Sequence, residues 1–175
     1  MADEIWILES EPIQVSFDTK GYMFYKGGRG ILGSPIESYL RLVAVKGEDK
    51  IEILIVSDLK ERVVIKSPDE ALEFVRLFTS IETHFLFKDI HSIEPRVADD
   101  APGIGEYTEE YERRMGLEPV RSSVEGDSFV IERNLVDNER KLFRAIERVG
   151  QDGAYSLETT RTIDAESPII YPIYQ

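Results

Sequence analysis

The chain has 175 residues, a formal net charge of −13, 42% hydrophobic residues and no cysteine. The size and hydrophobic content predict one globular domain over residues 1–175. The absence of cysteine excludes disulfides, thiolate nucleophiles and cysteine-ligated zinc, and the negative charge disfavours nucleic acid and anionic membrane as partners.

The N-terminal sequence MADEIWILESEP lacks the charged and apolar regions of a secretory signal. No stretch of the sequence reaches the ~20 apolar residues of a membrane span. These features favour a cytoplasmic protein that does not bind membrane.

The first part of the chain, residues 1–93, predicts antiparallel strands followed by a helix. We expect one or two short strands within residues 4–17, and then three β-branched runs at residues 39–45, 51–56 and 62–65. The connections between these three runs are too short for a parallel crossover, so they predict a meander.

Residues 68–79 carry the strongest local signal, which is that of an amphipathic helix. Ser67 at the N-cap, Pro68 at N1 and Glu70 at N3 form a capping box. Apolar residues recur at helical spacing from Ala71 to Phe78, so the helix should pack across one face of a sheet.

Residues 94–127, which we call the acidic segment, are rich in Pro, Gly and acidic residues and poor in large aliphatic ones. They predict a long loop excursion with one short helix near residues 108–115, ended by Gly116 in a left-handed conformation and by Pro119.

The last part, residues 128–175, predicts a second meander at residues 128–137, 141–149 and 154–163. The apolar tail after Pro168 should cover core surface, either in its own subunit or in a second copy as a homo-oligomer. The whole chain therefore predicts an α+β fold of mainly antiparallel sheet, in a sandwich-like or barrel-like arrangement, with one main helix packed on it.

The stretch YKGGRGILGSPIE matches the spacing of a dinucleotide-binding fingerprint at Gly28, Gly30 and Gly33. That fingerprint needs a parallel strand before it and a long crossover helix after it, whereas the following residues enter a tight hairpin. We favour the interpretation that these glycines form turns and allow a close approach between strands. The alternative is a small-anion site formed by Lys26, Gly28, Arg29 and Gly30.

Asp89 and His91 are the candidate catalytic residues. They lie two apart in a predicted strand and therefore share a face, and a histidine beside a carboxylate suits acid–base chemistry. A hydrogen-bonded surface histidine is the commoner arrangement of such a pair. We expect no metal and no cofactor.

Acidic and basic residues alternate along the last three predicted strands. We interpret them as a solvated sheet face with cross-strand ion pairs, each worth under ~1 kcal/mol. The residues concerned are Glu132, Arg133, Arg144, Glu147, Arg148, Glu158 and Arg161.

Tyr107 and Tyr111 lie one helical turn apart in the acidic segment, among Glu110 and other acidic residues. We favour the interpretation that these tyrosines fasten the excursion to the rest of the fold. The alternative is that Tyr107, Glu110 and Tyr111 form a docking surface for a basic protein partner.

The function that these observations favour is a non-catalytic binding or accessory module for a small ligand or a protein partner. The alternative is a small hydrolase or isomerase that uses carboxylates and His91 assembled in a cleft.

Overall fold

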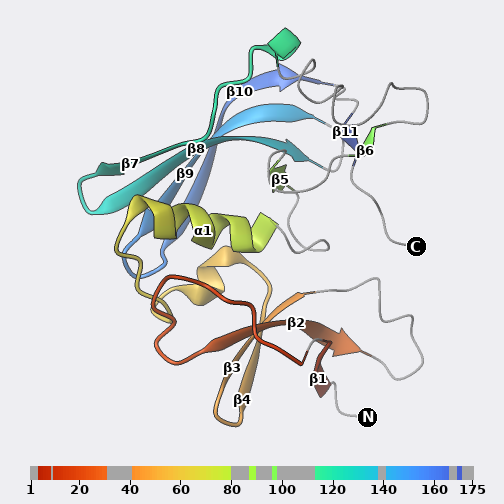
Figure 1. Cartoon of the computed structure of the whole chain (residues 1–175), viewed down its shortest axis with the longest axis vertical. Coiled ribbons are helices and arrows are strands. Elements are labelled where there is room, and N and C mark those ends of the chain that lie inside the picture. Colours follow the sequence, from red (N-terminus) through yellow and green to blue (C-terminus); the bar gives the residue numbers. More distant parts are fainter. Residues whose placement is uncertain are drawn as a thin grey trace.

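The computed structural model describes residues 4–8, 10–30, 41–79, 87–89, 96–97, 113–137, 141–165 and 169–170. Within these ranges the chain forms two main antiparallel sheets with a long helix between them (Figure 1). The predicted α+β fold, dominated by antiparallel sheet, is confirmed.

The first sheet contains four strands in chain order, each antiparallel to the next. They are β1 (Glu4–Ile7), β2 (Met23–Gly30), β3 (Arg41–Lys46) and β4 (Asp49–Ile53). The β3–β4 hairpin turns at Gly47, which has a φ of +62°. The sheet curls into a half-barrel that brings β1 near β4.

Strand β2 corrects the predicted turn at Gly28 and Gly30, while Gly33 lies outside the described residues. Gly28 and Gly30 lie within this strand and pair with β1, while the preceding part of β2 pairs antiparallel with β3. The antiparallel pairing is incompatible with the parallel crossover of a dinucleotide fingerprint. The close approach occurs one residue earlier, where a Cβ on Gly27 would lie 2.2 Å from the carbonyl oxygen of Trp6.

Residues 62–65 do not form the third strand that we expected. The chain first forms the short 3₁₀-helix η2 (Val56–Leu59), and Val64 then makes an isolated bridge with Asp18. The β-branched side chains of this segment are nevertheless used, because Val63 and Ile65 are fully buried in the core. The pattern therefore indicated burial correctly and strand geometry wrongly.

Helix α1 (Pro68–Thr79) has the predicted bounds and the predicted cap. The backbone N–H of Glu70 donates to Oγ of Ser67 over 3.1 Å, and the backbone N–H of Lys66 donates to the Glu70 carboxylate over 2.7 Å. The first bond satisfies a backbone donor that the first helical turn leaves without an intrahelical partner, and the second ties the residue before the N-cap to the helix.

The second sheet is built around β8 (Ser128–Asp137), which is antiparallel to β9 (Leu142–Gly150) on one side. The other side of β8 is shared by β7 (Arg121–Glu125) and β5 (Phe87–Asp89). Strand β10 (Tyr155–Asp164) pairs with β9, and two short strands, β6 (Arg96–Val97) and β11 (Ile169–Ile170), pair with each other.

Residues 96–97 and 113–127 of the acidic segment are described, and residues 96–97 form β6 instead of the expected loop. Residues 113–115 form a helical turn ended by Gly116 at a φ of +60°, as predicted. Residues 121–125, which we expected to be loop, form β7. Their sequence, RSSVE, has little strand propensity, so pairing with β8 determines their conformation.

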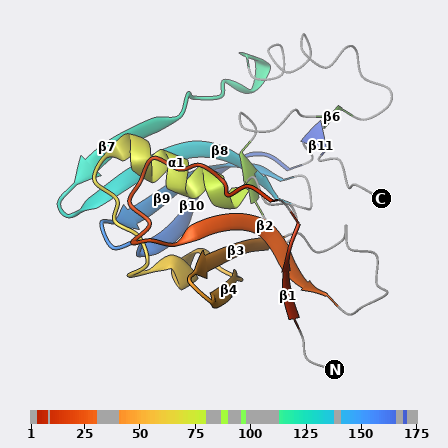
Figure 2. The same cartoon turned by 60° about the horizontal axis from the view of Figure 1, so that its bottom comes forward.

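Helix α1 lies between the two sheets and contributes to one buried apolar cluster that both sheets share (Figure 2). Phe24, Leu42 and Ile53 enter this cluster from the first sheet, and Phe129 and Ile131 enter it from the second. The helix contributes Ala71, Phe74, Val75 and Leu77.

The β9–β10 turn connects the second sheet to the segment after η2. The backbone N–H of Glu61 donates to the carbonyl of Asp152 over 2.7 Å, and that of Ile65 donates to the carbonyl of Gln151 over 2.9 Å. At Gly153, whose φ is +81°, an added Cβ would lie 2.6 Å from Cγ2 of Val63. The turn therefore has no room for a side chain.

Substituting this glycine should weaken the junction between the sheets. We expect Gly153→Ala to lower the free energy of unfolding by about 3 kcal/mol, because it adds an overpacked methyl group to a left-handed backbone. Gly126→Ala is the matched control, since its φ is +59° and a Cβ there meets nothing within 4 Å. The control should lose only about 1 kcal/mol in urea unfolding, and equal losses would contradict the packing argument.

Candidate functional site

The most unusual polar group in the described residues is a buried ion pair on the face of the second sheet that meets α1. Arg133 on β8 is 0% exposed and Glu147 on β9 is 1% exposed. Nε of Arg133 lies 2.5 Å from Oε2 of Glu147, and Nη2 lies 2.9 Å from Oε1, so the pair is bidentate. Nη2 also donates to the backbone carbonyl of Val75 in α1 over 3.4 Å.

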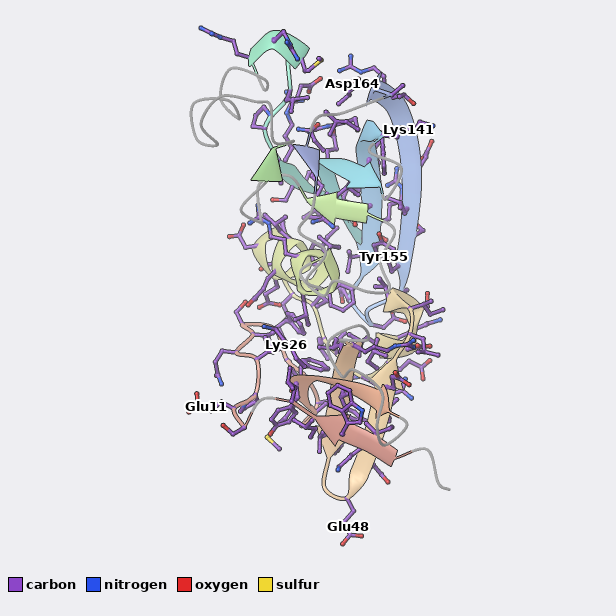
Figure 3. All side chains as sticks on the ribbon, turned by 90° about the vertical axis from the view of Figure 1, so that its right-hand side faces the viewer. Glu11, Lys26, Glu48, Lys141, Tyr155 and Asp164 are labelled. Carbon is purple, nitrogen blue, oxygen red and sulfur yellow. The ribbon has the colours of Figure 1, made fainter. Side chains whose placement is uncertain are left out.

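Tyr155 on β10 completes this group, which we call the inner network. Its hydroxyl donates to Oε1 of Glu147 over 2.8 Å. Burial, followed by the negative charge of Glu147 and this hydrogen bond, raises the pKa of Tyr155 well above its usual value. Figure 3 shows Tyr155 at the level of α1, at the lower end of β10.

The inner network is suited to holding elements together and unsuited to acid–base chemistry. Both oxygens of Glu147 accept hydrogen bonds from protein donors, and a general base must instead reach the proton of a substrate. The interpretation of a solvated face is therefore wrong for Arg133 and Glu147, which link three strands and the helix in the interior.

A second buried group lies on the opposite face of the same sheet. Nη1 and Nη2 of Arg144 donate to the carbonyls of Glu118 and Pro119, each over 3.0 Å. Nδ2 of Asn134 donates to the same Glu118 carbonyl over 2.8 Å, and Oδ1 of Asn134 accepts from Arg144 over 3.3 Å. We call these two side chains the carbonyl anchor.

The carbonyl anchor fixes the chain where the acidic segment enters β7. Asn134 is fully buried and Arg144 is 6% exposed, so both side chains were desolvated for contacts to backbone atoms. The sequence interpretation of a solvated face is wrong for Arg144, although the predicted cross-strand ion pair forms, with Nη2 of Arg144 3.5 Å from Oε2 of Glu132. Asn134 and Arg144 fasten the acidic segment before β7, in addition to the pairing of β7 itself with β8. The predicted fastening tyrosines lie outside the described residues.

The solvated interpretation holds at the rim of this outer face. Arg148 pairs with Glu125 over 2.7 Å, and both side chains are about half exposed. The hydrogen bond to Glu125 and its charge raise the pKa of Arg148 above the usual value. Such pairs contribute little to stability because solvent screens them.

The remaining predicted site residues are only partly described. Asp89 lies in β5 opposite Leu135 of β8, and His91 lies outside the described residues. Tyr107, Glu110 and Tyr111 also lie outside them.

The four residues of the predicted anion site all lie on β2. Lys26, Gly28 and Gly30 share one parity along the strand and Arg29 has the other. The amide groups proposed to bind the anion belong to a strand that pairs with β1, and the anion site stays a prediction.

Within the described ranges, no three His, Cys, Asp or Glu side chains are grouped so that they could hold a metal ion. Across the same ranges, no helix is both long and apolar enough to span a membrane.

Removing one member of the buried ion pair should be far more damaging than removing both. We expect Arg133→Met or Glu147→Leu alone to lower the free energy of unfolding by about 3–5 kcal/mol, because each leaves a buried charge unpaired. The double variant should recover most of that loss. About 1 kcal/mol should remain lost, because the Tyr155 hydroxyl no longer has Glu147 as its hydrogen-bond acceptor. Urea unfolding measures this coupling, and additive losses in the double variant would contradict it.

Tyr155 should make stability fall at high pH. Its pKa is raised in the folded state, so above about pH 10 the unfolded state loses this proton first and unfolding becomes more favourable. We expect the wild type to lose up to about 1.4 kcal/mol per pH unit more than Tyr155→Phe in that range. The difference between the two unfolding curves isolates Tyr155 from the other tyrosines, and parallel curves would refute this assignment.

Comparisons with protein-family models, with curated protein sequences and with solved structures found no match to the chain. What the protein does is therefore inferred from its own residues and contacts.

Proposed function

We propose that the protein is a non-catalytic binding module that contacts a protein partner with a basic surface through the acidic segment, residues 94–127. The observation that carries this proposal is the carbonyl anchor. Arg144 and Asn134 direct buried hydrogen bonds to the carbonyls of Glu118 and Pro119, at the point where this segment joins the sheet.

The anchor supports binding because burying a guanidinium group is costly. A desolvated arginine destabilises a fold unless its charge and donors are matched, and here Nη1 and Nη2 of Arg144 hold a connecting segment while the Glu132 carboxylate lies 3.5 Å from Nη2. A segment that its own fold already holds in place loses less conformational entropy when a partner binds it. Buried polar side chains of the second sheet thus fix the position of the acidic segment where it enters β7.

The charge of the segment indicates the chemistry of the partner. Its acidic residues outnumber its basic residues, and the chain as a whole carries a net charge of −13. Tyr107, Glu110 and Tyr111 combine aromatic and acidic groups, and aromatic side chains often dominate the energy of binding at interfaces. Complementary charge steers a basic partner toward this segment.

Two other functions are weaker proposals. A small ligand at Lys26, Gly28, Arg29 and Gly30 needs amides that are free to bind it, and these residues lie in a paired strand. A hydrolase or isomerase would depend on His91 and on a carboxylate other than Glu147, whose two oxygens are committed within the inner network.

The proposal is tested by neutralising the acidic segment. We expect a variant with Glu106, Glu109, Glu110 and Glu112 all changed to Gln to bind a basic partner at least about tenfold more weakly, because several opposite-charge contacts are lost. Proteins retained by the immobilised wild-type chain from a lysate of its source would first be identified. Each would then be purified and titrated by calorimetry.

The matched control removes the same charge elsewhere, with Glu11→Gln, Glu48→Gln, Asp49→Asn and Glu158→Gln. These side chains are exposed, and Figure 3 shows Glu11 and Glu48 at the periphery of the first sheet. The control should bind like the wild type. Equal weakening in both variants, or a retained partner that is acidic, would refute the acidic segment as the binding surface.

A further inference from the structure

Strand β7 forms one margin of the second sheet. Among the described strands it pairs with β8 alone, and it lies at the outer left of the sheet in both cartoon views (Figures 1 and 2). Arg121, Ser123, Val124 and Glu125 are exposed, and Val124 is the most exposed large apolar side chain in the described residues, at 59%. An edge of this kind can accept a further strand.

The backbone groups that β7 directs outward follow from its hairpin. Two residues, Gly126 and Asp127, connect Glu125 to Ser128, so Glu125 and Ser128 form the hydrogen-bonded pair that closes the turn. Bonded and non-bonded pairs alternate along antiparallel strands. The N–H and C=O groups of Ser122 and Val124 therefore point away from β8.

The sequence of β7 is complementary to itself in one antiparallel register. A twofold axis at Ser123 places Ser122 opposite Val124 of a second copy, and these are the residues with outward backbone groups. The same register places Arg121 opposite Glu125 of the second copy, twice, in non-hydrogen-bonded pairs where side chains lie closest.

The two margins of the second sheet differ in how well they could pair. Strand β10 forms the opposite margin, from Tyr155 to Asp164 in Figure 3, and its register with β9 shifts at two places. Bulges of this kind commonly prevent edge-to-edge pairing. Strand β7 pairs with β8 without a shift, and its two terminal charges have opposite signs.

We infer that two copies of the chain associate through β7, which joins their five-stranded sheets into one continuous sheet. The existing contacts of the terminal charges allow this. Arg121 lies 3.3 Å from Glu118, and Glu125 lies 2.7 Å from Arg148, but these side chains are all about half exposed or more. Each carboxylate can accept more than one donor. Pairing of five residues buries little area, so the dimer is weak and depends on concentration.

Sedimentation equilibrium of the purified full chain tests this inference over roughly micromolar to millimolar concentrations. The wild type should shift from monomer to dimer. Val124→Pro removes an outward N–H that β8 does not use, and it should weaken dimerisation at least about tenfold. Val124→Thr is the matched control, because it keeps this N–H and a β-branched side chain, and it should still dimerise.

Charge reversal provides a second arm that does not alter the backbone. Arg121→Glu should weaken the dimer roughly tenfold, because two attractive pairs become repulsive. Adding Glu125→Arg should restore it, because the register then pairs opposite charges again. Glu48→Arg changes the charge far from β7 and should not reproduce this pattern.

Three results would overturn the inference. The first is a wild type that stays monomeric over the whole range. The second is a dimer that survives Val124→Pro and is lost when the chain is truncated before Pro168, which would place the interface at the apolar tail. The third is a double charge reversal that fails to restore the association.

Discussion

The fold depends on the enclosure of the Arg133–Glu147 pair beneath α1. A buried ion pair is tolerated only when both charges are matched and their remaining donors and acceptors are satisfied. Here the guanidinium group reaches the Val75 carbonyl and the carboxylate receives the Tyr155 hydroxyl, so three strands and the helix must hold one relative position. Apolar packing between the sheets supplies the driving force for folding. The ion pair makes one relative placement of the strands and the helix more stable than the alternative placements.

The local elements were largely predictable because their signals are local. Helix α1 was predicted from its cap and apolar spacing, and β8, β9 and β10 were predicted from alternating runs bounded by turn residues. The errors lie where tertiary pairing overrides local preference. β2 continues through Gly28 and Gly30 because β1 pairs with it. The polar residues of β7 adopt an extended conformation because they pair with the edge of β8.

The inner network was missed although the sequence contains a signal for it. Arg133 has the same parity along its strand as Phe129, Ile131 and Leu135, all of which are buried. Glu147 likewise shares parity with three buried apolar residues, Phe143, Ala145 and Val149. Period-two alternation therefore places both charges on the core face, and weighting parity above charge would have paired them. The contacts of Arg144 to the carbonyls of Glu118 and Pro119 were not predictable, because backbone carbonyls leave no mark in a sequence, whereas its ion pair with Glu132 follows the predicted cross-strand pattern.

The two buried arginines fix neighbouring elements on opposite faces of the second sheet. Arg133 uses a carboxylate and fixes the helix on one face, whereas Arg144 uses backbone carbonyls and fixes the entry to β7 on the other. The second contact has a consequence for the sheet edge. β5 pairs with β8 at residues 135–137, so the chain before β7 cannot continue along the same edge.

The carbonyl anchor holds that chain on the face of the sheet opposite α1, and β7 is therefore presented as a short, regular strand whose outward backbone groups point away from β8. A long acidic connection and an accessible edge are thus products of a single constraint, the sharing of one side of β8 by two strands. Strand β10 is protected from edge-to-edge pairing by bulges, whereas the register of β7 with β8 is uninterrupted. The opposite charges at its two ends then favour a partner strand that runs antiparallel, as a second copy would, over one that runs parallel.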